Sequence, residues 1–370
     1  MNMGHKIRIY PTPEQEELCN KSFGCARFVY NHFLGMASES RFESYNKYNK
    51  QLTALKNELP WLKEPDKYAL QSALEDLRDA FNRFFSRQNR YPKFKRKHGP
   101  KQSYRTYIVA NQGKDKINYN IELSKEAIKL PKLGWVKANV HKPIDGQIKS
   151  VTVSKTGSGE FYASVCVEAD SVSQIPSGNG EIGLDLGIKD FVVTSSGEKI
   201  ANPKTLAKHE KRIALLQRNL SRKNKGSKNY AKNKAKLAKL HQKVANIRKD
   251  FQHKLSHRIV RDNQIIIIET LRVKNMLKNR RLSKAISDVS WSRFATMLEY
   301  KSKWHKREFH KVGAFFASSQ LCHVCEHKNP DVKDLDIRVW ECPKCKTVHD
   351  RDFNAAKNIL KQGLKELKTA

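Results

Sequence analysis

Residues 265–268 are four consecutive isoleucines, within the segment QIIIIET. Four β-branched residues in a row, without polar alternation, are typical of a strand that is buried on both faces. The run ends at Glu269, and the carboxyl end of a central strand is where α/β sheets usually place their functional side chains. This segment therefore predicts an α/β sheet and a first candidate site residue.

The length and charge of the chain indicate several domains and a polyanionic partner. Domains usually have roughly 100–200 residues, so 370 residues suggest two or three packed units. The 72 Lys and Arg against 37 Asp and Glu give a net charge of +35, which would repel itself unless a polyanion neutralised it. Nucleic acid is the leading partner, bound with a salt-sensitive affinity. A membrane fits less well, because no apolar run reaches the roughly 20 residues that span a bilayer.

Three of the seven cysteines are predicted to be buried thiols. The N-terminus lacks the apolar core of a signal peptide, so we expect the chain to stay in the cytoplasm, where disulfides are rare. Cys19, Cys25 and Cys166 lie in apolar patterns that favour burial.

The other four cysteines form a C-x2-C-x16-C-x2-C pattern: Cys322, Cys325, Cys342 and Cys345. Two thiolate pairs at this spacing are typical of a tetrahedral Zn²⁺ site, here within a zinc-binding element at 318–349. A catalytic zinc would keep an open position, so four cysteines favour a structural ion. Three histidines lie nearby, but four thiolates already complete the expected set: His323, His327 and His349.

The first half of the chain begins with a strand and continues as helices. Residues 5–10 alternate as in a strand. Thr12, Pro13 and Gln15 then supply an N-cap, a first-turn proline and a capping-box partner, so a helix begins there. A second helix is predicted over 67–86, where apolar residues recur at helical spacing. We expect residues 13–95 to form a helical bundle.

Residues 104–168 change to a two-residue period. Val151 and Val153 face Ala163, Val165 and Val167 across a Thr-Gly-Ser-Gly turn, which predicts a hairpin. A small β-barrel fits residues 1–12 and 96–175, with the helical bundle inserted into it. The segment SVSQIPSGNG, residues 171–180, then reads as a linker.

The second half, from residue 180, opens with two apolar strands and continues as a basic segment. Residues 201–250 hold 16 Lys and Arg against two acids. Leu237, Leu240, Val244 and Ile247 give this segment one narrow apolar seam, which predicts a helical hairpin within an insertion at 203–260. The charge excess favours an arm that faces phosphates over a merely solvated hairpin.

Two further acids, Asp185 and Asp352, are candidate site residues. Asp185 lies inside an apolar strand, where a carboxylate is costly unless it is paired or binds metal. Asp352 begins a helix in HDRDFNAAKNIL, although Asp350 and Asp352 are both plausible helix N-caps. For Asp185 and Glu269 the alternative is an ion pair with one of the many lysines. Asp190, near a turn, is predicted to be a turn residue.

Three acids on two strands and a helix start can converge on one point. Hard cations such as Mg²⁺ prefer oxygen ligands of this kind. Phosphodiester cleavage uses such a site, since two metal ions about 4 Å apart activate the attacking water and stabilise the leaving oxygen. No Ser-His-Asp order, Walker loop or GxGxxG fingerprint competes with this interpretation.

These motifs resemble the TnpB family, the OrfB proteins of insertion sequences, which are RNA-guided nucleases related to type V CRISPR effectors. The resemblance rests on GLDLGIKDF, IIIIET, SSQLCHVC with CPKC, and HDRDFNAAKNI, in that order. It extends over nearly the whole chain, including YPTPEQEELCNKSFGCARFVYNHFL, KLPKLGWVK and NRRLSKAISDVSW.

The resemblance implies a multidomain α+β and α/β fold. A wedge β-barrel with an inserted helical recognition lobe would precede an RNase H-like (RuvC) domain at 180–370, interrupted by the helical insertion and the zinc-binding element. It implies Asp185, Glu269 and Asp352 as catalytic residues that hold Mg²⁺ or Mn²⁺, with Asp352 chosen over Asp350 because it precedes x-N-A-A. A structural Zn²⁺ would occupy the cysteines.

The family further implies partners and an activity. The partners would be a guide RNA from the transposon end and target double-stranded DNA, with no membrane and no protein oligomer required. The activity would be a DNA endonuclease of the prokaryotic cytoplasm, associated with the nucleoid. A guided transcriptional regulator and a cut-and-join transposase are the alternatives, and the regulator would tolerate loss of the acids.

The family also implies a helix that reads a short motif beside the target. The helix that begins at Lys67 resembles this element, with Lys67, Tyr68 and Gln71 facing the groove, because Lys can contact guanine and Gln adenine. An ordinary exposed helix face is an equally good interpretation of these residues.

Overall fold

The computed structural model of the protein describes residues 1–40, 42–97, 99, 101–112, 117–141, 143–169, 175–176, 178–334 and 336–369. It consists of two compact units, Met1–Asp170 and Ser171–Ala370. The division falls at the start of the predicted linker, part of which lies outside the described residues.

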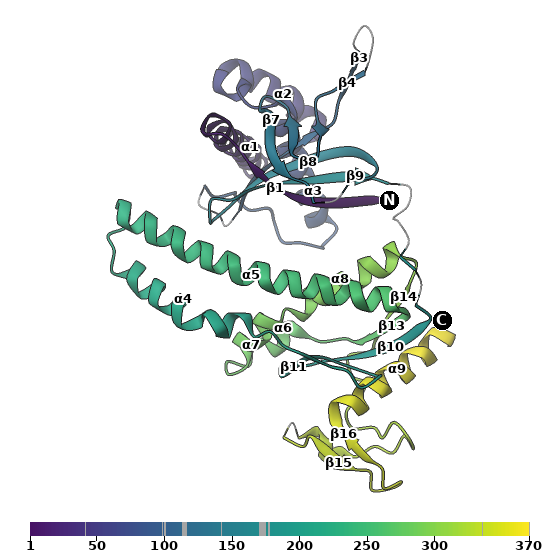
Figure 1. Ribbon diagram of the computed structural model, residues 1–370. Coiled ribbons are helices and arrows are strands. Elements are labelled where there is room, and N and C mark those ends of the chain that lie inside the picture. Colours follow the sequence, from purple (N-terminus) through teal and green to yellow (C-terminus); the bar gives the residue numbers. More distant parts are fainter. Residues whose placement is uncertain are drawn as a thin grey trace. The chain divides into compact units, whose positions relative to one another are not determined.

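The first unit combines helices with an antiparallel sheet (Figure 1). Its elements are β1 (Asn2–Tyr10), α1 (Pro13–Glu39), α2 (Tyr45–Glu58), η1 (Pro60–Lys63), α3 (Lys67–Phe85), β2 (Lys101–Tyr107), β3 (Ala110–Gln112), β4 (Ile117–Tyr119), β5 (Glu122–Leu123), β6 (Ala127–Leu130), β7 (Gly134–Asn139), β8 (Gln147–Thr156) and β9 (Phe161–Glu168).

Two helices of the first unit, α1 and α3, form where the sequence predicts them. At the start of α1, the Thr12 side chain accepts from the Gln15 backbone and the Gln15 side chain accepts from the Thr12 backbone, so the predicted capping box is confirmed. In α3, Leu70, Leu74, Leu77 and Phe81 are buried, and Phe84 is half-buried.

The main sheet of this unit has the order β2-β8-β9-β1-β7-β6-β5. The N-terminal strand β1 pairs with β9 on one side and β7 on the other, so the chain start is central to the sheet. Val151 pairs with Val165 and Val153 with Ala163, which confirms the predicted hairpin. Closure of this sheet into a barrel stays a prediction.

The second unit is a sheet covered on both faces by helices (Figure 1). Its elements are β10 (Gly180–Leu186), β11 (Asp190–Thr194), β12 (Lys199–Ala201), α4 (Thr205–Ser221), α5 (Lys228–Asp262), β13 (Asn263–Glu269), α6 (Val273–Met276), α7 (Ser283–Val289), α8 (Trp291–Trp304), β14 (Glu308–Val312), η2 (Pro330–Lys333), β15 (Val339–Glu341), β16 (Val348–Asp350) and α9 (Arg351–Thr369).

The isoleucine strand β13 lies inside this sheet, as predicted. The order is β12-β11-β10-β13-β14, with β13 parallel to both of its neighbours. Ile266 and Ile268 point to the core formed with α5 and α8, whereas Ile267 points to the core formed with α9. Both faces of β13 are therefore buried.

The helix α9 approaches the sheet closely because two glycines face the contact. A Cβ on Gly183 would lie 2.3 Å from the backbone oxygen of Ala356, and one on Gly363 would lie 2.3 Å from Cγ2 of Ile267. The predicted small residues Ala355 and Ala356 are also buried at this contact. The fit brings the first turn of α9 onto the sheet.

We expect Gly183→Ala to destabilise the second unit. The added methyl group would meet backbone atoms, which cannot move aside, and overpacking of this kind costs about 1–3 kcal/mol. The melting transition should fall by roughly 5 °C, as measured by scanning calorimetry. Gly313→Ala is the matched control, since its Cβ would have no neighbour within 4 Å. Equal melting temperatures for the two variants would contradict the packing described here.

The basic segment forms a helical hairpin of α4 and α5, as predicted (Figure 1). Ile213 of α4 packs against Leu240 and Val244 of α5, with Leu237 partly buried beside them. The predicted seam is wrong at Ile247, which is 39% exposed. On α5, the contact with α4 ends at Val244, one turn before Ile247.

Candidate active site and metal centre

The three predicted acids come from neighbouring positions in the second unit. Asp185 lies near the end of β10 and Glu269 is the last residue of β13, and these strands are parallel neighbours. Asp352 lies in the first turn of α9, which packs on β10. All three line one cavity of about 340 Å³. The fold thus brings together acids that are 167 residues apart at the extremes (352 minus 185).

The acids interact electrostatically in this cavity. Burial raises the pKa of Asp185 well above its ordinary value, and the negative charges of Glu269 and Asp352 raise it further. Burial also raises the pKa of Glu269 to about 7, although its carboxylate accepts a 3.1 Å hydrogen bond from the Leu186 backbone. Like charges held together at this cost are typical of a site that a cation completes.

Asp350 and Asp352 have different roles in the structure. The Asp350 carboxylate accepts from the Phe353 backbone at 3.0 Å, so it caps α9, and it pairs with Lys199 at 2.6 Å. Burial by itself would raise the pKa of Asp350, but these contacts together lower it below its ordinary value. Asp352, two residues later, lines the cavity instead. The N-cap interpretation therefore holds for Asp350 and not for Asp352.

The oxygen atoms of the three acids are not drawn into one tight cluster. Among the described residues, the group whose metal-ligand atoms all lie within 4.8 Å of one another is the four cysteines. The three acids are therefore brought to one cavity, but not into a preformed cluster of metal ligands.

The cavity also holds charged residues that the sequence analysis missed. Arg338 lies 3.6 Å from the Asp352 carboxylate, and both Arg338 and Arg351 lower the pKa of Asp185. Asp190, predicted to be only a turn residue, starts β11 and lines the same cavity. No sequence signal marks Arg338, because it is one cation among 72 Lys and Arg.

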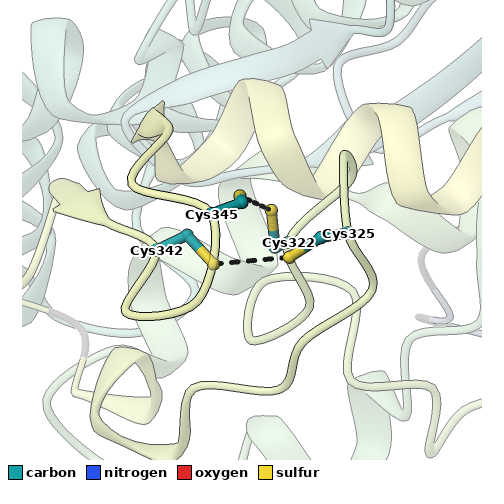
Figure 2. Close-up of side chains that lie close together, drawn as sticks. All are labelled: Cys322, Cys325, Cys342 and Cys345. Carbon is teal, nitrogen blue, oxygen red and sulfur yellow. Dashed lines mark hydrogen bonds between the residues drawn. The ribbon is translucent and has the colours of Figure 1, made fainter.

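The four cysteines meet as two opposed pairs, with their sulfurs turned toward one another (Figure 2). Cys322 Sγ is 3.6 Å from Cys345 Sγ, and Cys325 Sγ is 3.6 Å from Cys342 Sγ. Zn–S bonds of about 2.3 Å place tetrahedral sulfurs about 3.8 Å apart. The donor set therefore fits one Zn²⁺ ion.

The two cysteine pairs lie in two separate backbone turns of the same kind. The Cys322 backbone N–H donates to His327 O, and that of Cys342 donates to Thr347 O, both at 2.9 Å. The residue after each pair, Glu326 or Lys346, has a positive φ of 60° or 61°. His349 Nε2 lies 3.0 Å from Cys322 Sγ, within hydrogen-bond distance.

Hydrogen bonds connect the cysteine element to α9. The Asn354 side chain is fully buried, accepts from the His323 backbone at 2.9 Å and donates to Leu321 O at 2.7 Å. The Arg351 guanidinium donates to Asp334 O at 2.6 Å. These residues flank Asp352, so the element and the third acid are held by the same turn of helix.

The remaining predicted cysteines agree with the structure at two positions of three. Cys19 and Cys25 are buried, and burial raises their pKa values to about 12 and about 11. Cys166 is only half-buried, because β9 turns that side chain away from the core that Val165 and Val167 enter.

The predicted reading residues lie at the start of α3 in the first unit. Lys67 is exposed, and its ammonium group sits 4.8 Å from the centre of the Tyr68 ring. Tyr68 and Gln71 are half-buried. In the part of the chain that the structure describes, no helix is apolar and long enough to cross a membrane.

Three family models match the chain. A model described as "Probable transposase" (OrfB_IS605) matches residues 164–280, "Cas12f1-like, TNB domain" matches residues 291–359, and an OrfB_IS605 "Helix-turn-helix domain" matches residues 1–50. The second match contains the four cysteines, Arg338 and Asp352.

Relatives align over almost the entire chain. A Streptomyces pristinaespiralis protein named "Putative RNA-guided DNA endonuclease" is 39% identical over 97% of this chain and 89% of its own length. The Escherichia coli K12 protein named "Putative RNA-guided DNA endonuclease InsQ" is 30% identical over 97% of this chain and 91% of its own length.

A solved structure shares the fold at low sequence identity. The structure titled "Cryo-EM structure of the Cas12f1-sgRNA-target DNA complex" matches with a TM-score of 0.58 and 14% identity, over 97% of this chain and 98% of the other. This likeness shows a shared fold, whereas the two long relatives and the family models assign the family. The chain belongs to the TnpB family of insertion-sequence OrfB proteins.

Proposed function

We propose that this protein is a transposon-encoded, RNA-guided DNA endonuclease, which cleaves double-stranded DNA beside a short flanking motif by metal-dependent phosphodiester hydrolysis. The observation that carries the proposal is that three like-charged acids line one cavity of a chain with net charge +35. The names of the two long relatives support the same activity.

The proposed catalytic residues are Asp185, Glu269 and Asp352, which would hold Mg²⁺ or Mn²⁺. The fit rests on their mutual repulsion, which a divalent cation would relieve. When bound, the metal ions would supply an activated water and stabilise the leaving oxygen. Arg338 would keep Asp352 oriented and offer a guanidinium to a phosphate oxygen of the substrate.

The other parts of the chain would hold the nucleic acids and brace the site. Residues 1–12 and 96–175 would form the wedge, 13–95 the recognition lobe, and 180–370 the RuvC domain. The arm within 203–260 would grip the backbone of an RNA–DNA duplex, because its charge excess suits contacts without sequence preference. One Zn²⁺ would hold the cysteine element against α9, and the protein would act on the nucleoid.

The proposed reading residues of the flanking motif are Lys67, Tyr68 and Gln71. Lys67 and Gln71 are four residues apart on α3, so they share a helix face. The contact between Lys67 and the Tyr68 ring would steady the lysine for a base edge. Cleavage of a target library with randomised flanks tests this, since Gln71→Ala should relax the preference at one flanking position and an unchanged preference would reject it.

The proposed activity is tested with the purified ribonucleoprotein. We expect linear product when it is incubated with Mg²⁺ and a plasmid that carries a match to the co-purifying RNA, and intact plasmid when EDTA replaces Mg²⁺. A plasmid that is bound but uncut in Mg²⁺ would indicate a guided transcriptional regulator. Strand-transferred product would indicate a transposase that cuts and joins.

A further inference from the structure

Phe315 lies between β14 and the first cysteine pair and is the most exposed large hydrophobic residue of the described chain, at 83%. The adjacent Phe316 instead packs against the core around Ile267. Single exposed apolar side chains are common on protein surfaces, so exposure alone assigns no role to Phe315. Its surroundings give it one.

One face of the Phe315 ring is already covered by a cation. The Arg272 guanidinium lies 4.3 Å from the ring centre. At 83% exposure, much of the rest of the ring remains open to solvent. A phenylalanine held by a stacked arginine loses little conformational freedom when a second flat group stacks on it.

This pair stands beside the cavity of the three acids. Leu271, next to Arg272, lines that cavity, and so do Ser318 and Ser319, which follow Phe315 by three and four residues. The last residue of β14 pairs with Glu269. The segments that carry Arg272 and Phe315 therefore leave the sheet at the same edge, next to the proposed catalytic residues.

The surface beside the pair is strongly basic. Residues 270–287 contain six Lys and Arg and no acid. All six are exposed: Arg272, Lys274, Lys278, Arg280, Arg281 and Lys284. Cations that track a phosphate backbone, next to an aromatic face for a base, are the usual elements of a single-strand binding site.

We propose that Phe315 and Arg272 form a stacking site for an unpaired base of single-stranded DNA, which positions the adjoining phosphate in the cavity of the three acids. The base must be unpaired, because bases inside a duplex are already stacked on both faces. Any base has a flat face to offer, so the site has no sequence preference. The identity of the strand as DNA rests on the proposed function.

Photochemical cross-linking tests the contact without requiring cleavage. Full-length Asp185→Ala protein is irradiated with a DNA oligonucleotide that carries one 5-iodouracil, and the cross-linked peptide is mapped by mass spectrometry. We expect the cross-link at Phe315. Cross-links that all map to other peptides would overturn the proposal, and an RNA oligonucleotide that reacts at Phe315 as well as the DNA would overturn the assignment to DNA.

Two substitutions of Phe315 in the otherwise native protein distinguish aromatic stacking from simple apolar contact. Phe315→Leu keeps an apolar side chain without an aromatic face and should lower kcat/KM for DNA cleavage about tenfold. Phe315→Tyr keeps the face and should behave as native protein. Equal kcat/KM values for these variants would overturn the stacking role while leaving the nuclease activity intact. A cross-link at Phe315 together with native protein that cuts no DNA in Mg²⁺ would sustain the stacking site and reject the nuclease.

Discussion

Asp185→Ala is expected to abolish DNA cleavage while leaving RNA binding nearly intact. Asp185 is the acid on which the other two act most directly, since Glu269 and Asp352 both raise its pKa. Its loss removes a carboxylate from the centre of the proposed metal site. Metal ions contribute several kcal/mol to such reactions, so the cleavage rate should fall by at least about 10³-fold. Plasmid cleavage and electrophoretic RNA binding measure the two effects.

Asp350→Asn is the matched control for this prediction. Asparagine caps a helix as well as aspartate does, so the start of α9 should survive, although the ion pair with Lys199 is lost. We expect cleavage within about threefold of native, because an exposed ion pair contributes about 0–1 kcal/mol. Loss of cleavage in both variants, or loss of RNA binding in Asp185→Ala, would contradict a catalytic role specific to Asp185.

A second measurement tests whether the acids hold metal. Without metal, Asp185→Asn should melt at a higher temperature than native protein, because it removes a buried charge that Glu269 and Asp352 repel. Added Mg²⁺ should raise the melting temperature of native protein more than that of the variant, since a ligand stabilises the state that binds it. Equal responses to Mg²⁺ would place the metal elsewhere.

The sequence predicted the parts of this site that depend on strand burial. The four isoleucines place β13 in the sheet interior. The apolar strand around Asp185 pairs with β13, and Asp185 lies near its carboxyl end. Both inferences need only local patterns, because burial on two faces leaves no polar alternation. The turn geometry of the cysteine pairs is equally local, so their meeting could be expected from spacing alone.

Other contributions to the site depend on tertiary packing and leave no local pattern. Arg338 reaches the cavity only because the cysteine element folds back on α9. Phe316 packs on the core around Ile267 whereas the adjacent Phe315 is exposed, and no local pattern distinguishes the two. The choice between Asp350 and Asp352 was open by residue type. The structure shows that Asp350 caps α9, through the hydrogen bond that it accepts from the Phe353 backbone, and the catalytic role of Asp352 stays a prediction.

Cys342→Ser is expected to unfold the cysteine element and to remove cleavage with it. The element has only a small core, in which Cys322, Val332, Trp340 and Cys342 are buried. Cores of this size rarely fold without metal, and a structural Zn²⁺ supplies about 10–16 kcal/mol in small zinc domains. We expect bound zinc to fall from about one ion per chain to almost none, and backbone amides of residues 321–350 to lose protection from hydrogen exchange.

Cleavage should fall with the element because its contacts hold the first turn of α9. Loss of the partners of Asn354 and Arg351 frees the turn that carries Asp352, and Arg338 leaves the cavity. A displacement of 1 Å at a catalytic group can cost about 100-fold in rate.

Cys166→Ser, which removes a half-buried thiol outside the element, should keep both zinc and cleavage. Asn354→Ala should keep zinc but lose cleavage. A Cys342→Ser protein that loses zinc and protection yet still cuts DNA would show that Asp352 does not depend on the element.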